Sequence, residues 1–92
     1  RAGGGVMETM IGRRLPDRDP GGPDTCFAPG DYGRLSSTWI CCTPNGHLGN
    51  LSNHDVTEHQ DGTITVSPSI LVSVDGAEVW HGWLERGVWR SV

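Results

Sequence analysis

Residues 63–92 read Thr63-Ile-Thr-Val-Ser-Pro-Ser-Ile-Leu-Val-Ser-Val-Asp-Gly-Ala-Glu-Val-Trp-His-Gly-Trp-Leu-Glu-Arg-Gly-Val-Trp-Arg-Ser-Val92, and they hold three of the four tryptophans of the chain. The dipeptide Asp75-Gly76 interrupts this stretch, and such a pair readily adopts the positive φ angles of a two-residue hairpin turn. A second turn is expected at residues 85–87, as a three-residue loop with Gly87 in the left-handed region. The stretch therefore predicts three successive antiparallel strands.

The turn at Asp75-Gly76 predicts the pairing of the first hairpin: Val74 with Ala77, Val72 with Val79 and Ile70 with His81. One face of the hairpin would then carry Ile70, Val72, Val74, Val79, His81 and Trp83, and the other Leu71, Ser73, Glu78, Trp80 and Leu84. The first face is the more apolar, so it is expected to lie on the core. The second turn places Trp83 opposite Trp89 as a cross-strand pair.

Length and composition limit the possible classes of protein. A chain of 92 residues with 35% hydrophobic content and 14 glycines predicts one small domain, part of which is not core. The net charge of -4 argues against nucleic-acid binding. No apolar run approaches the roughly 20 residues of a membrane span. The three cysteines are an odd number and predict no disulfide framework, which favours a reducing cytoplasm.

The N-terminal part differs in composition from the rest. Residues 1–25 are rich in Gly and Pro and poor in apolar side chains, so we expect an extended arm that is either flexible or laid across the sheet or a partner. Residues 1–6 contain no start methionine and fit a cloning remnant. Residues 26–92 are the predicted β domain. Its turn signals predict an all-β fold of about six short strands, as a single antiparallel sheet or a part-closed barrel.

The polar side chains between residues 41 and 59 are the candidates for a metal site or for catalysis. Zinc could be held by Cys42, His47, His54 and His59, but the spacing typical of structural zinc sites is absent. The adjacent thiols Cys41 and Cys42 point to opposite faces of a strand, and Cys26 is far away in sequence. No nucleophile motif accompanies the His and carboxylate pairs, so we expect neither a cofactor nor an enzyme.

Exposed aromatic and aliphatic side chains are the candidates for a protein contact. Trp80 shares the less apolar hairpin face with Leu71 and Leu84, and Trp39 lies in the strand predicted around residues 38–43. These four residues define either the second side of a closed barrel or a contact patch for a protein partner or a second copy of the chain.

Two runs of the sequence also carry a resemblance. Glu58-His-Gln-Asp-Gly-Thr-Ile-Thr-Val-Ser-Pro-Ser-Ile-Leu-Val72 and Trp80-His-Gly-Trp-Leu-Glu-Arg-Gly-Val-Trp-Arg90 resemble a family of small uncharacterised proteins of actinobacteria, their phages and prophages. A wider group that shares the Ser-Pro-Ser-Ile strand often has a cysteine-rich metal site. This chain has Trp80 before His81 and lacks the cysteine knuckle, which argues against that site.

The resemblance implies a compact β domain of phage-related origin and no known activity. We therefore expect a small non-catalytic protein-binding module in the host cytoplasm. The alternatives are a zinc-binding domain or metal-dependent enzyme that uses His47, His54 and His59, and a structural or decoration protein of the virion.

Overall fold

The computed structural model describes residues 9–18 and 27–92, and these residues are organised by β-strands without any helix. The strands are β1 (Thr9–Ile11), β2 (Arg13–Arg14), β3 (Asp31–Leu35), β4 (Thr38–Cys42), β5 (Leu48–Asn50), β6 (Asp55–Glu58), β7 (Ile64–Val74), β8 (Ala77–Glu85) and β9 (Val88–Ser91). The predicted all-β class is confirmed. Residues 27–92 hold seven strands, close to the six predicted for the β domain, and residues 9–14 add two more. The predicted single sheet or part-closed barrel is wrong, because the nine strands of the described part form two sheets.

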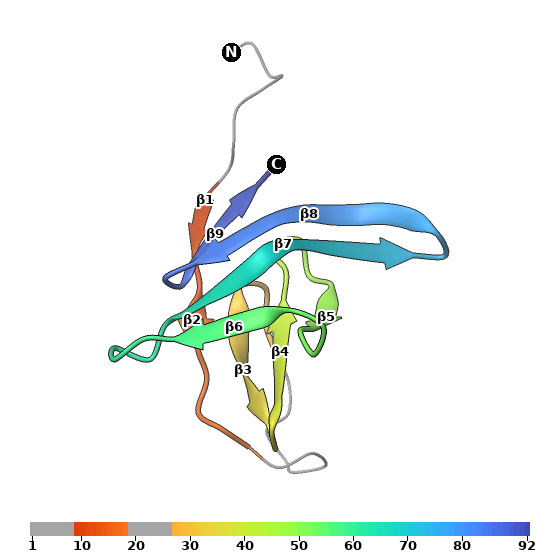
Figure 1. The fold of residues 1–92 in the computed structure, drawn as a ribbon. Helices are drawn as coiled ribbons and strands as arrows, with labels where there is room; N and C mark the ends of the chain where they lie inside the picture. Colours follow the sequence, from red (N-terminus) through yellow and green to blue (C-terminus); the bar gives the residue numbers. More distant parts are fainter. Residues whose placement is uncertain (1–8, 19–26) are drawn as a thin grey trace.

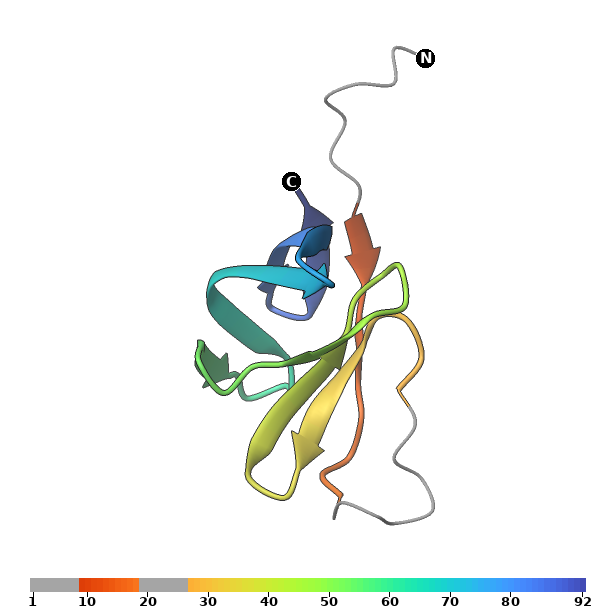
Figure 2. The ribbon, with the colours of Figure 1, turned by 90° about the vertical axis from the view of Figure 1, so that its right-hand side faces the viewer.

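The larger sheet has the strand order β1-β9-β8-β7-β6, and the smaller one has the order β2-β3-β4-β5 (Figure 1). All neighbouring strands are antiparallel except β2 and β3. The long β7–β8 hairpin extends beyond the rest of the molecule, and β3 and β4 run across its direction (Figures 1 and 2). Side chains between the two sheets form the core, so each strand needs only one apolar face.

Residues 9–18 contribute one strand to each sheet, β1 to the larger and β2 to the smaller. The chain changes sheets at Gly12, whose N–H donates to the carbonyl of Gly87 at 2.7 Å, while Arg13 N–H donates to the carbonyl of Gly30 at 3.1 Å. A side chain does not fit at this crossing, because a Cβ on Gly12 would lie 2.8 Å from the indole nitrogen of Trp89. A flexible arm is therefore wrong for residues 9–18, and the alternative of a segment laid across the sheet describes them. Residues 1–8 and 19–26 lie outside the described part.

The core is made of large side chains from both sheets. Fully or almost fully buried are Leu15, Tyr32, Cys41, Cys42, Leu51, Ile64, Val66, Ile70, Trp80, Leu84 and Trp89. Leu15 comes from the segment that was predicted to be an arm. Its burial shows that this segment takes part in the packing and that the β domain does not begin at residue 26.

The first hairpin turn is confirmed, but the predicted register holds only beside it. Asp75 and Gly76 have φ angles of 52° and 81°, and Val74 pairs with Ala77. Beyond this point Val72 pairs with Trp80 and Ile70 with Gly82, because Val79 is an extra residue in β8. A shift of one residue moves every later side chain to the opposite face. Trp80 and Leu84 therefore lie in the core, and the predicted core positions His81 and Trp83 are only half-buried.

The second turn has two residues, not three. Arg86 and Gly87 have φ angles of 46° and 77°, and Glu85 pairs with Val88. The left-handed conformation predicted for Gly87 is confirmed. The predicted pair of Trp83 and Trp89 is wrong, because the shorter loop places Trp89 opposite Leu84 and Trp83 opposite Arg90.

Candidate functional site, an apolar pocket beside an edge strand

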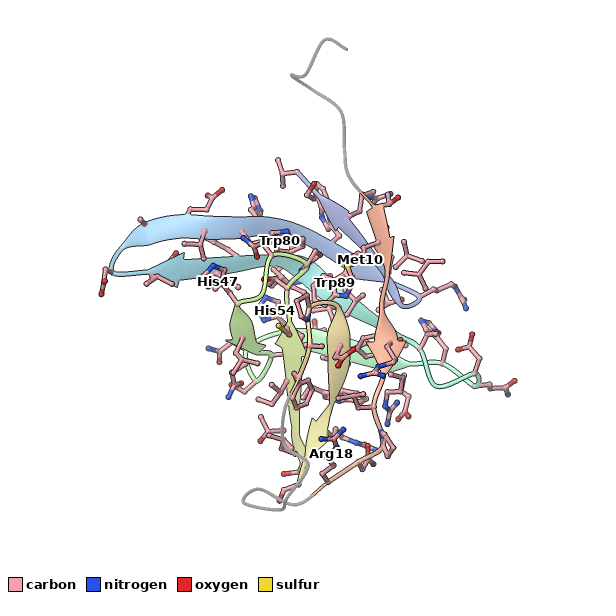
Figure 3. The ribbon with its side chains drawn as sticks, turned by 180° about the vertical axis from the view of Figure 1, so that it is seen from behind. Met10, Arg18, His47, His54, Trp80 and Trp89 are labelled. Carbon is pink, nitrogen blue, oxygen red and sulfur yellow. The ribbon has the colours of Figure 1, made fainter. Side chains whose placement is uncertain are left out.

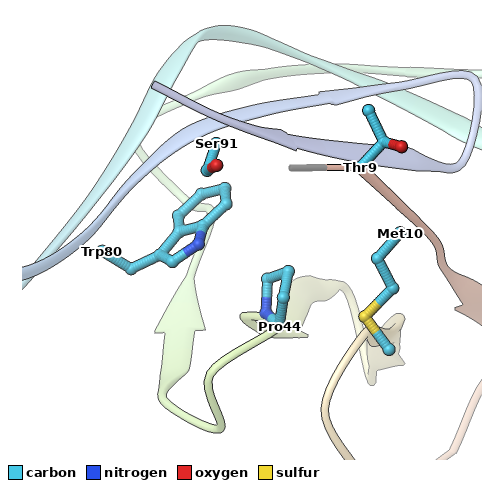
Figure 4. A pocket seen from close by; sticks show the side chains of 5 residues that line it. All are labelled: Thr9, Met10, Pro44, Trp80 and Ser91. Atoms are coloured by element: carbon cyan, nitrogen blue, oxygen red, sulfur yellow. The ribbon is translucent and has the colours of Figure 1, made fainter. Parts of the chain in front are cut away.

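A pocket of about 180 Å³ opens where the end of the larger sheet meets the turn after β4. It is lined by Thr9, Met10, Pro44, Trp80 and Ser91, which come from β1, the turn, β8 and β9 (Figure 4). Met10, Trp80 and Trp89 lie close together at this end of the molecule (Figure 3). The lining is mainly apolar, with hydroxyl groups of Thr9 and Ser91 among it.

Trp80 forms the back wall of the pocket. The bulge at Val79 turns Trp80 inward, where its ring meets that of Trp89 edge-on, and it keeps 8% of its surface exposed. The ring lies over Gly82, since a Cβ on Gly82 would fall 2.5 Å from the ring carbon Cη2 of Trp80. The indole nitrogen is on the side of the ring that faces Pro44 and Met10 (Figure 4). This wall thus presents a flat apolar surface with one hydrogen-bond donor.

Pro44 forms a second wall that is tied to the strand carrying Trp80. The side-chain amide of Asn45 donates to the carbonyl of Val79 at 2.8 Å, and Gly46 N–H donates to the carbonyl of Thr43 at 2.8 Å. Gly46 has a φ of 95°, a backbone conformation that glycine adopts without steric cost in this tight turn. The pocket is therefore pre-formed by two elements that hold each other in place.

Met10 forms the third wall, and its side chain is the one that can change conformation most easily. Its thioether packs against Gly30, where a Cβ would lie 2.9 Å from the Met10 methyl carbon. Methionine side chains are unbranched and adjust readily to a bound group. The next residue, Ile11, is 84% exposed and lies on the opposite face of β1. Met10 therefore lies on the face of β1 that borders the pocket, and Ile11 lies on the outer face.

The strand beside the pocket has one unpaired edge within its sheet. The N–H of Gly12 points toward β9. Because these directions alternate along an antiparallel strand, the backbone N–H and C=O groups of Met10 also point toward β9, whereas those of Thr9 and Ile11 point away from it. The edge strand at the other side of this sheet, β6, carries Asp55 and Glu58, whereas β1 carries no charge. Charged residues on an edge strand oppose pairing with another chain, so β1 is the less protected edge.

The residues predicted as protein contacts fall in different environments. Trp80 lines the pocket, whereas Leu84 is fully buried and offers no surface. Leu71 is 54% exposed and pairs with His81. Trp39 is half-buried, with the guanidinium groups of Arg14 and Arg34 at 4.8 and 5.0 Å from its ring. The structure therefore does not bring these four residues together into one patch.

Four residues that line the pocket were not among the residues predicted from the sequence: Thr9, Met10, Pro44 and Ser91. Thr9 and Met10 lie in the segment that was predicted to be an arm, and Pro44 and Ser91 carry no sequence pattern that marks a site. No local signal identifies them, because their proximity to Trp80 depends on the pairing of β1 with β9 and on the bulge in β8.

The candidate zinc ligands do not converge in the described residues. No group of three His, Cys, Asp or Glu side chains in residues 9–18 and 27–92 is placed to hold a metal ion. A ring nitrogen of His54 lies 3.2 Å from the carbonyl of Ser69, and one of His59 lies 2.7 Å from the hydroxyl of Thr65. Burial raises the pKa of the Cys41 thiol to about 12, and burial together with Asp31 also raises the pKa of Cys42. Cys26 lies outside the described part.

The chain matches no protein family model, no curated protein and no solved structure. Within the described residues, no helix is present that is long and apolar enough to cross a membrane. The function is therefore inferred from the pocket and its surroundings.

Proposed function

We propose that this protein is a small non-catalytic protein-binding module that anchors one apolar side chain of its partner in the pocket formed by Met10, Pro44 and Trp80. The observation that carries this proposal is the pocket itself, pre-formed and open beside the uncharged strand β1. Tryptophan and methionine are enriched in the centres of protein interfaces, where a partner side chain fills a well-packed pocket.

The size of the pocket favours a side chain over a free ligand. Sites for drug-sized ligands and cofactors typically have volumes of about 300–1,000 Å³. The volume here is about 180 Å³, which suits one aliphatic side chain. A single side chain gives little affinity alone, so it would act together with contacts along the neighbouring edge strand. The resemblance to phage and prophage proteins favours a host protein as partner, in the host cytoplasm.

The proposal is tested by selecting peptides from a displayed library of random sequences against the full chain. Selected peptides are then measured against two variants, Met10→Asp and Leu71→Asp. Both variants place an aspartate at an exposed position of the larger sheet, but only Met10 faces the pocket, and Leu71 lies on β7, which β8 and β9 separate from β1. We expect Met10→Asp to weaken binding by about tenfold or more, because a carboxylate would have to be desolvated against an apolar group.

Leu71→Asp is expected to change the affinity by less than about threefold, since an exposed substitution away from the pocket and from β1 has a small effect. Circular dichroism of both variants checks that they remain folded. Peptides that bind equally well to the two variants would rule out the pocket as the binding site, and a library that yields no Met10-dependent peptide would do the same.

A further inference from the structure

We propose that the pocket binds a proline of the partner, held in an extended polyproline II segment, and that the indole N–H of Trp80 donates a hydrogen bond to a backbone carbonyl of that segment. This inference rests on the proposed function, and it names the residue type and the conformation that the pocket recognises. It is carried by an unused hydrogen-bond donor in the wall of a mainly apolar pocket.

The donor is the indole nitrogen of Trp80. In the part of the chain that the structure describes, no group accepts a hydrogen bond from it, whereas the N–H of Trp89 donates to the carbonyl of Gly30 at 2.9 Å. The nitrogen of Trp80 is not one of the described side-chain nitrogens that are both buried and without a partner. It lies on the side of the ring that faces Pro44 and Met10 (Figure 4), so it is accessible from the pocket.

A bound group therefore has to bring an acceptor. A ligand that covers the N–H displaces water from it, and a buried donor without an acceptor is unfavourable. The electrostatic complement of an N–H dipole is a carbonyl oxygen, which a peptide carries in its main chain. A carboxylate would also accept the bond, but none of the five described lining residues carries a charge that could balance it.

Proline combines an apolar ring with such a carbonyl. The ring is compact, and the flat face of Trp80 and the ring of Pro44 offer surfaces against which it packs (Figure 4). The amide that precedes a proline has a carbonyl but no N–H, so its burial adds an acceptor without adding an unpaired donor. Other aliphatic residues bring a backbone N–H as well, and that donor also needs an acceptor.

The conformation of the segment follows from the same residue. The residue before a proline is restricted to the extended and polyproline II regions, and a polyproline II segment has no internal hydrogen bonds, so its carbonyls are available to Trp80. Such a segment loses little conformational entropy on binding, which matters for a pocket of only about 180 Å³. Grooves that bind proline-rich segments are lined by aromatic side chains, as this pocket is by Trp80.

The other three tryptophans are less suited to this role. Trp89 is fully buried and its N–H is already bonded. One guanidinium group lies 5.3 Å from the ring centre of Trp83, and two lie 4.8 and 5.0 Å from that of Trp39. Neither of these two rings lines the apolar pocket. Trp80 thus joins an unpaired donor to a small apolar cavity.

The Met10-dependent peptides from the library are the probe for this inference. We expect them to share a proline at a common position. Replacing this proline with leucine keeps an aliphatic side chain and restores the N–H, and it should weaken binding by about tenfold or more. Replacing it with N-methylalanine keeps an amide without N–H and should weaken binding by less than about fivefold. Calorimetric titration measures the affinities.

The hydrogen bond is tested on the protein. Trp80→Phe keeps an aromatic ring and removes the donor, so it should weaken binding of these peptides by about tenfold. Trp83→Phe is the matched control and should change the affinity by less than about threefold, because Trp83 pairs with Arg90 and does not line the pocket. Urea unfolding checks that both variants are folded. In the wild type, the NMR signal of the Trp80 indole proton should move downfield when a peptide binds.

The outcomes separate this inference from the proposed function. Met10-dependent peptides that lack proline, or that tolerate its replacement with leucine, would overturn proline recognition and leave the protein-binding pocket intact. An indole signal that does not move would overturn the hydrogen bond from Trp80. Peptides that are insensitive to Met10→Asp overturn both proposals. If the chain alone sediments as a dimer, if Met10→Asp makes it monomeric and if no selected peptide competes, the pocket receives a second copy and the inference is wrong.

Discussion

The indole rings of Trp80 and Trp89 meet edge-on, with centroids 5.4 Å apart and planes inclined by 85°. Trp89 is fully buried and its indole N–H donates to the carbonyl of Gly30 at 2.9 Å, whereas Trp80 reaches the pocket. Aromatic rings favour this arrangement because the positive edge of one meets the negative face of the other. The pair thus connects the centre of the core to the wall of the candidate site.

Replacing Trp89 with phenylalanine should destabilise the protein by about 2–3 kcal/mol. The variant loses the volume of the larger ring and leaves the buried carbonyl of Gly30 without its indole donor. Urea unfolding of both proteins measures the difference. Trp83→Phe is the matched control, because Trp83 is half-buried and pairs with Arg90 at the surface, and a loss below about 1 kcal/mol is expected there. Equal losses in the two variants would contradict the assignment of Trp89 to the core.

Gly87→Ala should lower the stability of the folded protein more than Gly46→Ala does, and Gly87→Val should lower it further. Both glycines have left-handed backbones, so both variants carry a conformational cost of about 1–2 kcal/mol. A Cβ on Gly87 would also fall 2.8 Å from the hydroxyl oxygen of Tyr32, whereas nothing lies within 4 Å of one on Gly46. Melting temperatures report the difference, and equal values for Gly87→Ala and Gly46→Ala would show that the contact with Tyr32 does not matter.

Stability should fall in acid, and part of this loss should come from Asp31. Burial alone would raise the pKa of Asp31, but the hydrogen bonds from Arg13 and from the N–H of Ala28 outweigh it and hold the pKa below its ordinary value of 3.8. A group with a lowered pKa in the folded state stabilises the protein above its unfolded pKa, and this contribution is lost as the pH falls through the folded pKa.

Asp31→Asn tests this expectation. The variant should be about 1–3 kcal/mol less stable at neutral pH, because hydrogen bonds to a charged acceptor are lost. The difference in the free energy of unfolding between the variant and the wild type should become smaller as the pH falls below the ordinary carboxyl pKa of 3.8. Hydrogen bonds from Arg34 and Arg14 to Asp17 also lower the pKa of that residue, so the variant keeps some acid sensitivity. A difference that stays constant with pH would argue against the role of Asp31.

The thiols of Cys41 and Cys42 should resist alkylation in the folded protein. Both side chains are buried, and burial raises their pKa values, to about 12 for Cys41, so little thiolate forms at neutral pH. We expect a Cys26→Ser variant to incorporate iodoacetamide only after unfolding in urea, as mass spectrometry would show. Rapid labelling of the folded variant would mean that the strand carrying these residues opens readily.

Stoichiometric zinc is not expected, and this stays a prediction. Cys42, His47, His54 and His59 form no group in the described residues, and His54 and His59 use ring nitrogens in contacts with Ser69 and Thr65. Elemental analysis of untagged protein tests the point, together with melting in the presence of a chelator. About one zinc per chain and a large drop in melting temperature would favour the metal-binding alternative.

Local signals in the sequence were sufficient for the turns and for the class of the fold. Asp75-Gly76 and Gly87 were identified because few residues other than glycine adopt positive φ angles at low cost. The β-branched stretch around residues 70–74 identified a strand for a similar local reason. Neither signal depends on distant parts of the chain, and both predictions agree with the structure.

The sequence by itself thus determined that the chain forms antiparallel hairpins that turn near Asp75-Gly76 and Gly87, but not the length of the second loop. The tertiary structure decided which faces are buried, because one bulged residue, Val79, reverses the orientation of Trp80 and the residues after it. It also decided the place of residues 9–18, whose few apolar side chains predict no strand in isolation. Only the packing of Gly12 against Trp89 and the pairing of β1 with β9 place Met10 beside Trp80. The candidate site depends on these long-range contacts, and the local sequence pattern gives no information about the free energy that they contribute.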